Sequence, residues 1–254
     1  MSFVSREKGK SDHHRRTDKN KEDPLADNIA TIGIYSTFPR QKTADRRERG
    51  GMPIIVMKNS LDRWVSAFVV PEKGACEYAV KAVSREIQNA GYNRIIIKSD
   101  QEPAIKELLH AVKRERAEQI EFAGIGEEGS AVGESSSNGM VERAIQDVQA
   151  QMRTVKMELE WRYGGNKLKE DHPILPWLIR YSAMQINIAR KREDGRTAYE
   201  RRRGKRYLRE LPEFGECVWY LRPESKSKDK SDSRWEDGIF VGIREESKKI
   251  LIAT

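Results

Sequence analysis

The sequence has little cysteine and no long apolar run, and each scarcity excludes a class of protein. Its two cysteines, Cys76 and Cys217, lie far apart, with no second cysteine or histidine at metal-ligand spacing, which argues against a disulfide framework and a structural zinc site. No stretch approaches the roughly 18 apolar residues of a membrane span, and the N-terminus lacks the apolar stretch of a signal peptide. We therefore expect a protein of a reducing compartment, the nucleus or otherwise the cytoplasm, with no membrane partner.

Aromatic residues are also few, whereas charged residues are in excess. Aromatics make up 7% of the 254 residues and charged side chains 35%, so part of the chain is expected to lie outside any packed core. The 48 lysines and arginines exceed the 40 acidic residues and give a formal net charge of +8. This balance favours a polyanionic partner, and DNA is the leading candidate.

The composition changes along the chain and predicts three parts. Residues 1–27 are rich in charge and poor in apolar side chains, which predicts a disordered leader. Residues 28–206 carry the periodic apolar patterns of a core domain with helices at its C-terminal end. Residues 207–254 alternate apolar and polar side chains in three short runs, which predicts a small β-rich module.

Within the core, apolar periodicity predicts three strands, then alternating helices and strands. The expected strands cover residues 29–35, 53–57, 63–70, 94–98 and 118–122, and the expected helices cover residues 78–91, 102–117, 138–155, 173–190 and 197–203. Residues 124–137, with four glycines and four serines, are expected to form a loop. Because the first three strands form hairpins and the later ones follow helical crossovers, we predict an α/β fold with a mixed five-stranded sheet flanked by helices. That order is typical of the ribonuclease-H-like fold.

Two carboxylates follow rigid elements of this predicted sheet. Asp100 ends a buried strand, and Glu142 lies near the start of the helix that follows the glycine- and serine-rich loop. Phosphoryl transfer by two metal ions needs carboxylates from different elements, because each Mg²⁺ takes oxygen ligands and keeps positions open for the phosphate. The alternative is purely structural: an Asp after a strand often forms a turn or a helix cap, and a Glu in a first turn favours the helix dipole.

The residues around both carboxylates resemble a known family. The sequence Lys98-Ser99-Asp100-Gln101-Glu102 after an apolar strand, followed by Ser137-Asn138-Gly139-Met140-Val141-Glu142-Arg143, is similar to the catalytic core of retroviral and retrotransposon integrases. The resemblance covers about residues 29–206. The module after it, with Phe214-Gly215-Glu216 before Val218-Trp219-Tyr220, resembles the segment that follows this core in retrotransposon Pol polyproteins. The resemblance of the core implies DNA integration by Mg²⁺- or Mn²⁺-dependent DNA cleavage and strand transfer, with Asp100 and Glu142 as catalytic metal ligands.

One position departs from the family pattern. The resemblance implies a further catalytic Asp on the first strand, and Tyr35 stands at the matching place. A neutral phenol with a pKa near 10 is a poor Mg²⁺ ligand. Asp62, in a turn between two strands, is a weak substitute. Asp27 precedes the first strand and Asp45 lies in the charged loop after it, so neither is expected to point at the site. Glu134 ranks below Glu142 because it falls in the predicted loop.

A basic run near the end of the core is the second functional feature. Its members predicted to contact DNA phosphates are Arg190, Lys191, Arg192, Arg201, Arg202, Arg203, Lys205 and Arg206. The alternatives are a solvated linker and a nuclear-import signal. The tryptophans Trp64, Trp177 and Trp219 are expected in the core.

Taken with the resemblance, these patterns predict a retroelement integrase-like protein whose enzymatic activity is in question at Tyr35. Its expected partners are DNA and, where it assembles, further copies of itself. Two other functions stay open at this stage: a DNA-binding remnant without enzymatic activity, and a domesticated module for protein interaction.

Overall fold

The computed structural model describes residues 29–37, 52–92, 94–99, 102–117, 124–129, 135–169, 171–221 and 234–254. The predicted leader, residues 1–27, lies outside these ranges. Among the described helices, none is both long and apolar enough to cross a membrane.

The larger sheet is mixed, as predicted. Its strands are β1 (Ala30–Thr37), β2 (Ile54–Asn59), β3 (Val65–Val69), β4 (Arg94–Ser99) and β5 (Gly124–Gly129), in the order β3-β2-β1-β4-β5. β2 runs antiparallel to both β1 and β3, whereas β4 runs parallel to β1 and to β5. The predicted α/β class is thus confirmed, with β1 between the antiparallel and the parallel half.

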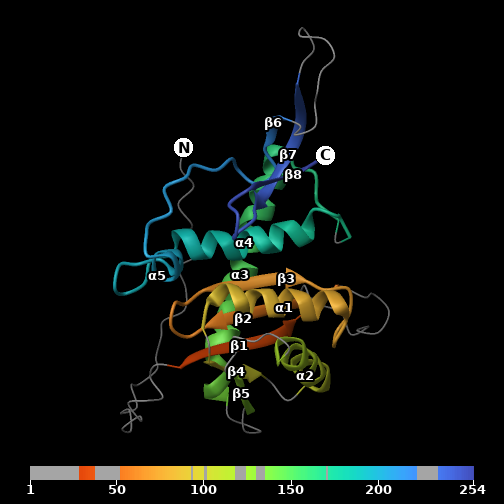
Figure 1. Ribbon diagram of the computed structural model, residues 1–254. Coiled ribbons are helices and arrows are strands. Elements are labelled where there is room, and N and C mark those ends of the chain that lie inside the picture. The colour runs from red at the N-terminus through yellow and green to blue at the C-terminus, as the bar shows by residue number, and fades with distance from the viewer. Residues whose placement is uncertain are drawn as a thin grey trace.

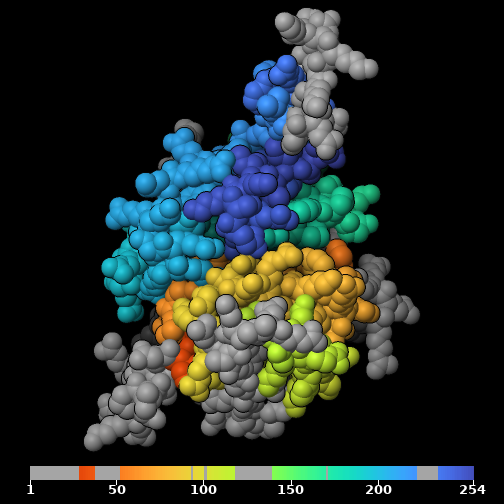
Figure 2. Space-filling model, in the orientation of Figure 1, coloured from red at the N-terminus to blue at the C-terminus, as the bar shows by residue number. Residues whose placement is uncertain are grey.

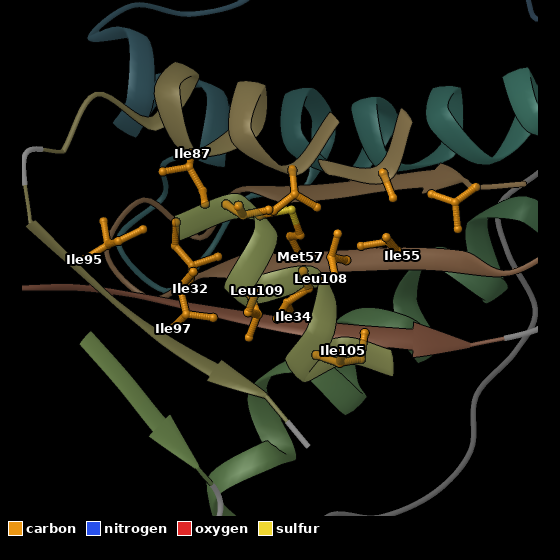
Figure 3. Close-up of a cluster of buried hydrophobic side chains, with 14 of the residues drawn as sticks. Ile32, Ile34, Ile55, Met57, Ile87, Ile95, Ile97, Ile105, Leu108 and Leu109 are labelled. Atoms are coloured by element: carbon orange, nitrogen blue, oxygen red, sulfur yellow. The ribbon is translucent and has the colours of Figure 1, made fainter. Parts of the chain in front are cut away.

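Helices cover both faces of this sheet (Figure 1). They are α1 (Glu77–Ala90), α2 (Pro103–Ala117), α3 (Ser135–Arg162), α4 (Leu175–Ala189) and α5 (Ala198–Arg203). α1 and α2 pack on one face, where the core in Figure 3 includes Ile32, Ile34, Ile55, Met57, Ile87, Ile95, Ile97, Ile105, Leu108 and Leu109. α3 and α4 pack on the other face against Ile54, Val56, Val65 and Ala67. Because successive side chains of a strand point to opposite faces, each strand supplies both cores.

A glycine lets α3 approach β1 closely. Gly33 lies beneath Val141, and a Cβ atom at Gly33 would come within 1.9 Å of the Val141 side chain. A larger residue would therefore push the helix off the strand. Since Gly33 and Tyr35 are two positions apart on β1, they share the face that α3 covers.

The last strand of the sheet and the start of α3 differ from the sequence prediction. The fifth strand was expected at residues 118–122, but β5 is Gly124–Gly129, at the start of the predicted loop. It pairs with β4 over six residue positions. Backbone pairing at the sheet edge thus overrides the low strand propensity of Gly and Glu. α3 begins at Ser135, so Asn138 lies within the helix instead of capping it.

The C-terminal residues form the predicted small β module. Its strands are β6 (Cys217–Leu221), β7 (Trp235–Ile243) and β8 (Ile250–Ala253), antiparallel in the order β6-β7-β8. Phe240 and Val241 share a buried cluster with Leu159 of α3 and Leu178 of α4. The module thus packs directly on the helical layer, as the dark blue surface in Figure 2 shows.

Two of the three tryptophans expected in the core are exposed. Trp64 is buried, but Trp177 is 39% and Trp219 76% exposed. Trp219 lies on the strand face of β6 that points away from the shared cluster, because its neighbour Val218 is the residue packed inward. Alternation along a short strand does not reveal which of its two faces meets the core.

Candidate active site and nucleic-acid interface

Tyr35 lies on β1 where the family resemblance places a carboxylate. It pairs with Val56 of β2, and the preceding Ile34 lies opposite Ser99 of β4. The side chain is half-buried on the face that α3 covers. Tyr35 is therefore on the strand next to β4, as the sequence predicted.

Glu142 lies on α3 near the point where this helix crosses β1. The preceding residue, Val141, is the one that contacts Gly33, and the Glu142 side chain is exposed. It lies seven residues after the first residue of α3 and not in its first turn. Because the effect of the helix dipole is confined to the first turn, the dipole does not explain a glutamate at this position. Tyr35 thus lies on the face of β1 that α3 covers, and Glu142 follows the α3 residue that contacts this strand.

Asp100 falls outside the described residues, as does Glu134. β4 ends at Ser99, one residue before Asp100. The approach of Asp100 to Glu142 therefore stays a prediction. Glu102, the next acidic residue, forms an ion pair with Lys73.

The residues described at this site do not make up a set of metal ligands. Across the described ranges, no group of three His, Cys, Asp or Glu side chains is placed to hold a metal ion. At the crossing of β1 and α3, Glu142 supplies a carboxylate, whereas Tyr35 supplies a phenol. We therefore derive no catalytic step through a metal.

Asp62, the weak substitute, is committed elsewhere. Its Oδ2 accepts a hydrogen bond from Arg202 Nε at 2.6 Å, and its Oδ1 accepts one from the Trp64 backbone N–H at 2.8 Å. Both side chains of the ion pair are almost fully buried, with exposed fractions of 6% for Arg202 and 5% for Asp62. The Arg202 guanidinium also lies 4.2 Å from the centre of the Trp64 ring. Asp62 is thus a structural residue.

This ion pair revises the predicted DNA contact at Arg202. A guanidinium that is buried between a carboxylate and an indole has little surface left for a phosphate. Two further members of the basic run also have carboxylate partners on the surface: Arg201 contacts Asp194 at 2.7 Å and Arg206 contacts Glu200 at 3.2 Å. Lys191, Arg203 and Lys205 are exposed.

A different group of cations gathers around Asp147 of α3. Arg190 Nη1 lies 2.5 Å and Arg143 Nε 3.5 Å from the carboxylate of Asp147. Arg192 and the buried Lys58 of β2 interact electrostatically with the same carboxylate. Burial, together with the repulsion of Arg192, lowers the pKa of Lys58 to about 7.

Sequence reasoning included Arg190 and Arg192 but missed Lys58 and Arg143. One signal was available for Lys58. It follows Val56 by two residues on an apolar strand, so alternation along the strand predicts a lysine on a buried face. A local signal also marks Arg143, because its i, i+4 spacing from Asp147 is that of an ion pair on one helix face.

A cavity of about 250 Å³ lies at the β3 edge, between α1 and α4. Glu86, Arg180 and Glu245 are among its lining residues. Glu245 comes from the turn between β7 and β8, and its burial, together with the nearby Glu86, raises its pKa well above the ordinary value. The cavity belongs to elements other than β1 and α3 and so is separate from the Tyr35 and Glu142 site.

Comparisons with known proteins give structural similarities alone. No family model matches the chain, and no curated protein matches its sequence. Among solved structures, the catalytic core domain of BIV integrase aligns with a TM-score of 0.45 and 19% identity, over 67% of this chain and 91% of that one. The HTLV-2 integrase catalytic core domain in complex with magnesium aligns with a TM-score of 0.48 and 14% identity, over 68% and 95%.

A larger assembly is also similar. A chain of the simian T-cell lymphotropic virus intasome, solved in complex with a PP2A regulatory subunit, aligns with a TM-score of 0.49 and 15% identity, over 88% of this chain and 75% of that one. All these TM-scores lie below 0.5. These similarities concern the fold, and the residues of this chain alone indicate its function.

Proposed function

We propose that this chain is an integrase-like, DNA-binding protein of retroelement origin whose strand-transfer chemistry is disabled at Tyr35. The observation that carries the proposal is the position of Tyr35. It lies on the central strand β1, on the face that α3 covers, and there the motif resemblance calls for a carboxylate. The resemblance to a piece of a Pol polyprotein and a location in the nucleus belong to the same proposal.

The chemical reason for low activity is the loss of one negative charge and one oxygen ligand. In the proposed ancestral site, Asp100, Glu142 and a third carboxylate would hold Mg²⁺ or Mn²⁺, which would activate the attacking oxygen and stabilise the phosphate. A phenol stays neutral at pH 7 and leaves such a site short of charge. Electrostatic stabilisation of this kind commonly supplies several kcal/mol, and each 1.4 kcal/mol is about tenfold in rate.

DNA binding does not need the lost carboxylate. Lys191, Arg203 and Lys205 are exposed, and Arg190, which follows α4, has part of its side chain accessible. Phosphate contacts of this type supply most of the affinity for DNA irrespective of sequence. The protein would thus keep binding while it lacks strand transfer.

The test of this proposal is restoration of the carboxylate by Tyr35→Asp. Strand transfer into labelled duplex DNA, measured with Mg²⁺ and with Mn²⁺, should be close to background for the unaltered chain and should rise by orders of magnitude in the variant. Tyr35→Phe is the matched control and should stay inactive, because it changes the same side chain without adding charge.

Two further variants identify the remaining ligands. In the Tyr35→Asp background, Asp100→Asn or Glu142→Gln should abolish the gained activity. Efficient transfer by the unaltered chain that persists after Glu142→Gln would contradict the proposed site. A Tyr35→Asp variant that binds DNA but transfers no strands would mean that the site has lost more than one ligand.

One observation favours the rival function in protein interaction. Leu221 and Trp235 are exposed at paired positions of β6 and β7, and Trp219 is exposed two residues before Leu221 on the same strand face, with exposed fractions of 51% to 76%. Exposed aromatic side chains of this kind are typical of binding surfaces. If that surface is the main function, DNA affinity should be weak and insensitive to salt, whereas the proposed function requires a steep dependence on salt.

A further inference from the structure

The cations around Asp147 come from three separate parts of the chain. Lys58 is the residue before the last of β2, Arg63 lies in the turn before β3, Arg143 lies on α3, and Arg190 and Arg192 follow α4. The side chain of Asn187 anchors the end of α4 to β3, because it accepts a hydrogen bond from the Val65 N–H at 2.9 Å and donates one to the Val65 carbonyl at 2.7 Å. These bonds fix the position of the end of α4 relative to β3, and Arg190 and Arg192 follow directly after it.

The segment after α4 is also held by its own backbone. Arg192 N–H donates to the Arg196 carbonyl at 3.0 Å, and Lys191 forms an isolated β-bridge with Thr197. This small hairpin turns the chain back toward α5. Its hydrogen bonds hold Arg192 beside Lys58 and Asp147.

Positive charge is in surplus at this place. Asp147 is the carboxylate that both Arg190 and Arg143 contact. The groups that act on Lys58 are Arg192 and Arg63, which lower its pKa, and Asp147 and Asp62, which raise it. Asp62 is already paired with Arg202. Burial and the neighbouring Arg190 likewise lower the pKa of Arg192. The cations therefore repel one another more than the carboxylates offset.

The backbone at Arg63 adds an independent sign of constraint. Arg63 has φ of 63°, in the left-handed region that non-glycine residues rarely adopt. Its carbonyl accepts a hydrogen bond from Lys58 Nζ. A strained residue persists where the surroundings hold it, and such residues cluster at functional sites. Here the strained turn places one cation and fixes the amine of another.

We propose that Lys58, Arg63, Arg143, Arg190 and Arg192 form a phosphate-binding site that holds one stretch of a nucleic-acid backbone against α3. This inference rests on the proposed function and names the part of the surface that would carry it. A phosphodiester would supply the negative charge that Asp147 alone does not provide. Asp147 lies five residues after Glu142, about 7.5 Å along the axis of α3 and about 140° around it. The proposed site and Glu142 are thus on the same helix but on different sides of it.

The position of Lys58 beneath the arginines gives the site a proton linkage. With a pKa of about 7, Lys58 is partly neutral at neutral pH in the free protein. A phosphate nearby favours the charged amine, so binding takes up a proton when the pH is above about 7. Affinity for nucleic acid should thus fall as the pH rises, by at most about tenfold per pH unit.

The test measures the affinity of the full chain for a fluorescently labelled duplex of random sequence, from pH 6.5 to 8.5 at fixed salt. The unaltered chain should lose affinity several-fold across this range. Lys58→Arg, which stays charged, should bind with little dependence on pH. Asp147→Asn should bind several-fold more tightly, because it frees two arginines. Lys81→Ala, which removes an exposed cation on α1, is the matched control and should behave like the unaltered chain.

The outcomes separate this inference from the proposed function. If the unaltered chain binds with a steep salt dependence but Lys58→Arg keeps the full pH dependence and Asp147→Asn does not tighten binding, the inference is overturned and the proposed function stands. If the unaltered chain does not bind the duplex, both are overturned. Thermal unfolding confirms that each variant is folded, and Lys58→Met, which should bind more weakly below pH 7, replaces Lys58→Arg if arginine does not fit.

Discussion

The arginines of α5 and the cations around Asp147 differ in how many carboxylates they meet. On and after α5, Arg201, Arg202 and Arg206 each have a carboxylate partner of their own, on Asp194, Asp62 and Glu200. Around Asp147, by contrast, Arg143 and Arg190 share one carboxylate, and Lys58 and Arg192 are repelled by their neighbours.

The difference teaches that the number of basic residues in a stretch of sequence does not measure its capacity to bind DNA. The charge of a paired arginine is neutralised by a carboxylate of the same chain, whereas surplus cations can attract a phosphate backbone. We therefore expect the paired region to stabilise the protein, and the surplus region to destabilise it slightly and, under the proposed function, to bind the phosphate backbone.

The largest expected effect on stability comes from the buried pair. Arg202→Ala should lower the free energy of unfolding by about 3–5 kcal/mol, because Asp62 would stay buried without its counter-charge. Arg203→Ala, one residue away and exposed, should change it by less than about 0.5 kcal/mol. Urea unfolding of both variants measures the contrast, and equal effects would mean that the buried pair stabilises the fold no more than an exposed arginine does.

In the surplus region, removing the charge of Lys58 should raise the free energy of unfolding, whereas removing Arg202 lowers it. Because the pKa of Lys58 is lower in the folded than in the unfolded protein, the unfolded chain binds the extra proton between about pH 7 and the ordinary lysine pKa. Stability of the unaltered chain should therefore rise with pH above 7, by up to about 1.4 kcal/mol per pH unit.

Lys58→Met removes this titration. It should unfold with a flatter pH dependence and be more stable than the unaltered chain at pH 7, by about 1–2 kcal/mol. Denaturant unfolding at pH 7 and pH 9 gives both quantities. A variant less stable than the unaltered chain at pH 7 would mean that Lys58 is held in place by its contacts and not opposed by its neighbours.

A smaller effect is expected at the start of α5. Thr197 accepts a hydrogen bond from the Glu200 N–H at 3.1 Å, and Glu200 accepts one from the Thr197 N–H at 2.7 Å, so the two form a capping box. Thr197→Ala should cost about 1 kcal/mol of stability. DNA affinity should stay unchanged, since the paired region is structural. A loss of affinity without a loss of stability would assign a binding role to α5.

Much of the fold could be predicted from the sequence, since apolar periodicity is a local property. The buried positions Val141, Val148 and Val155 of α3 follow directly from their spacing, and the left-handed Gly91 ends α1 as expected. β5 could not be placed in this way. Its residues are mostly Gly and Glu, and only pairing with β4 makes them a strand.

The residues of the candidate site could be predicted where a local motif marks them. Contacts between residues far apart in the sequence could not. The motif identified Tyr35, on the face of β1 that α3 covers, and Glu142, next to the Val141 that contacts Gly33. The pair of Arg202 and Asp62, 140 residues apart, has no local signature. For the same reason, no pattern in the sequence joins Lys58 to Arg192.

The central claim is that the surplus cations around Asp147, and not the paired arginines on and after α5, bind the DNA backbone. The most direct measurement is the salt dependence of DNA affinity for Arg190→Ala/Arg192→Ala beside Arg201→Ala/Arg206→Ala, each of which removes two positive charges. The first double variant should bind more weakly, and its slope of log affinity against log salt should be shallower by about 2. The second should keep the slope of the unaltered chain. Equal slopes for the two variants, or the larger loss in the second, would contradict the account.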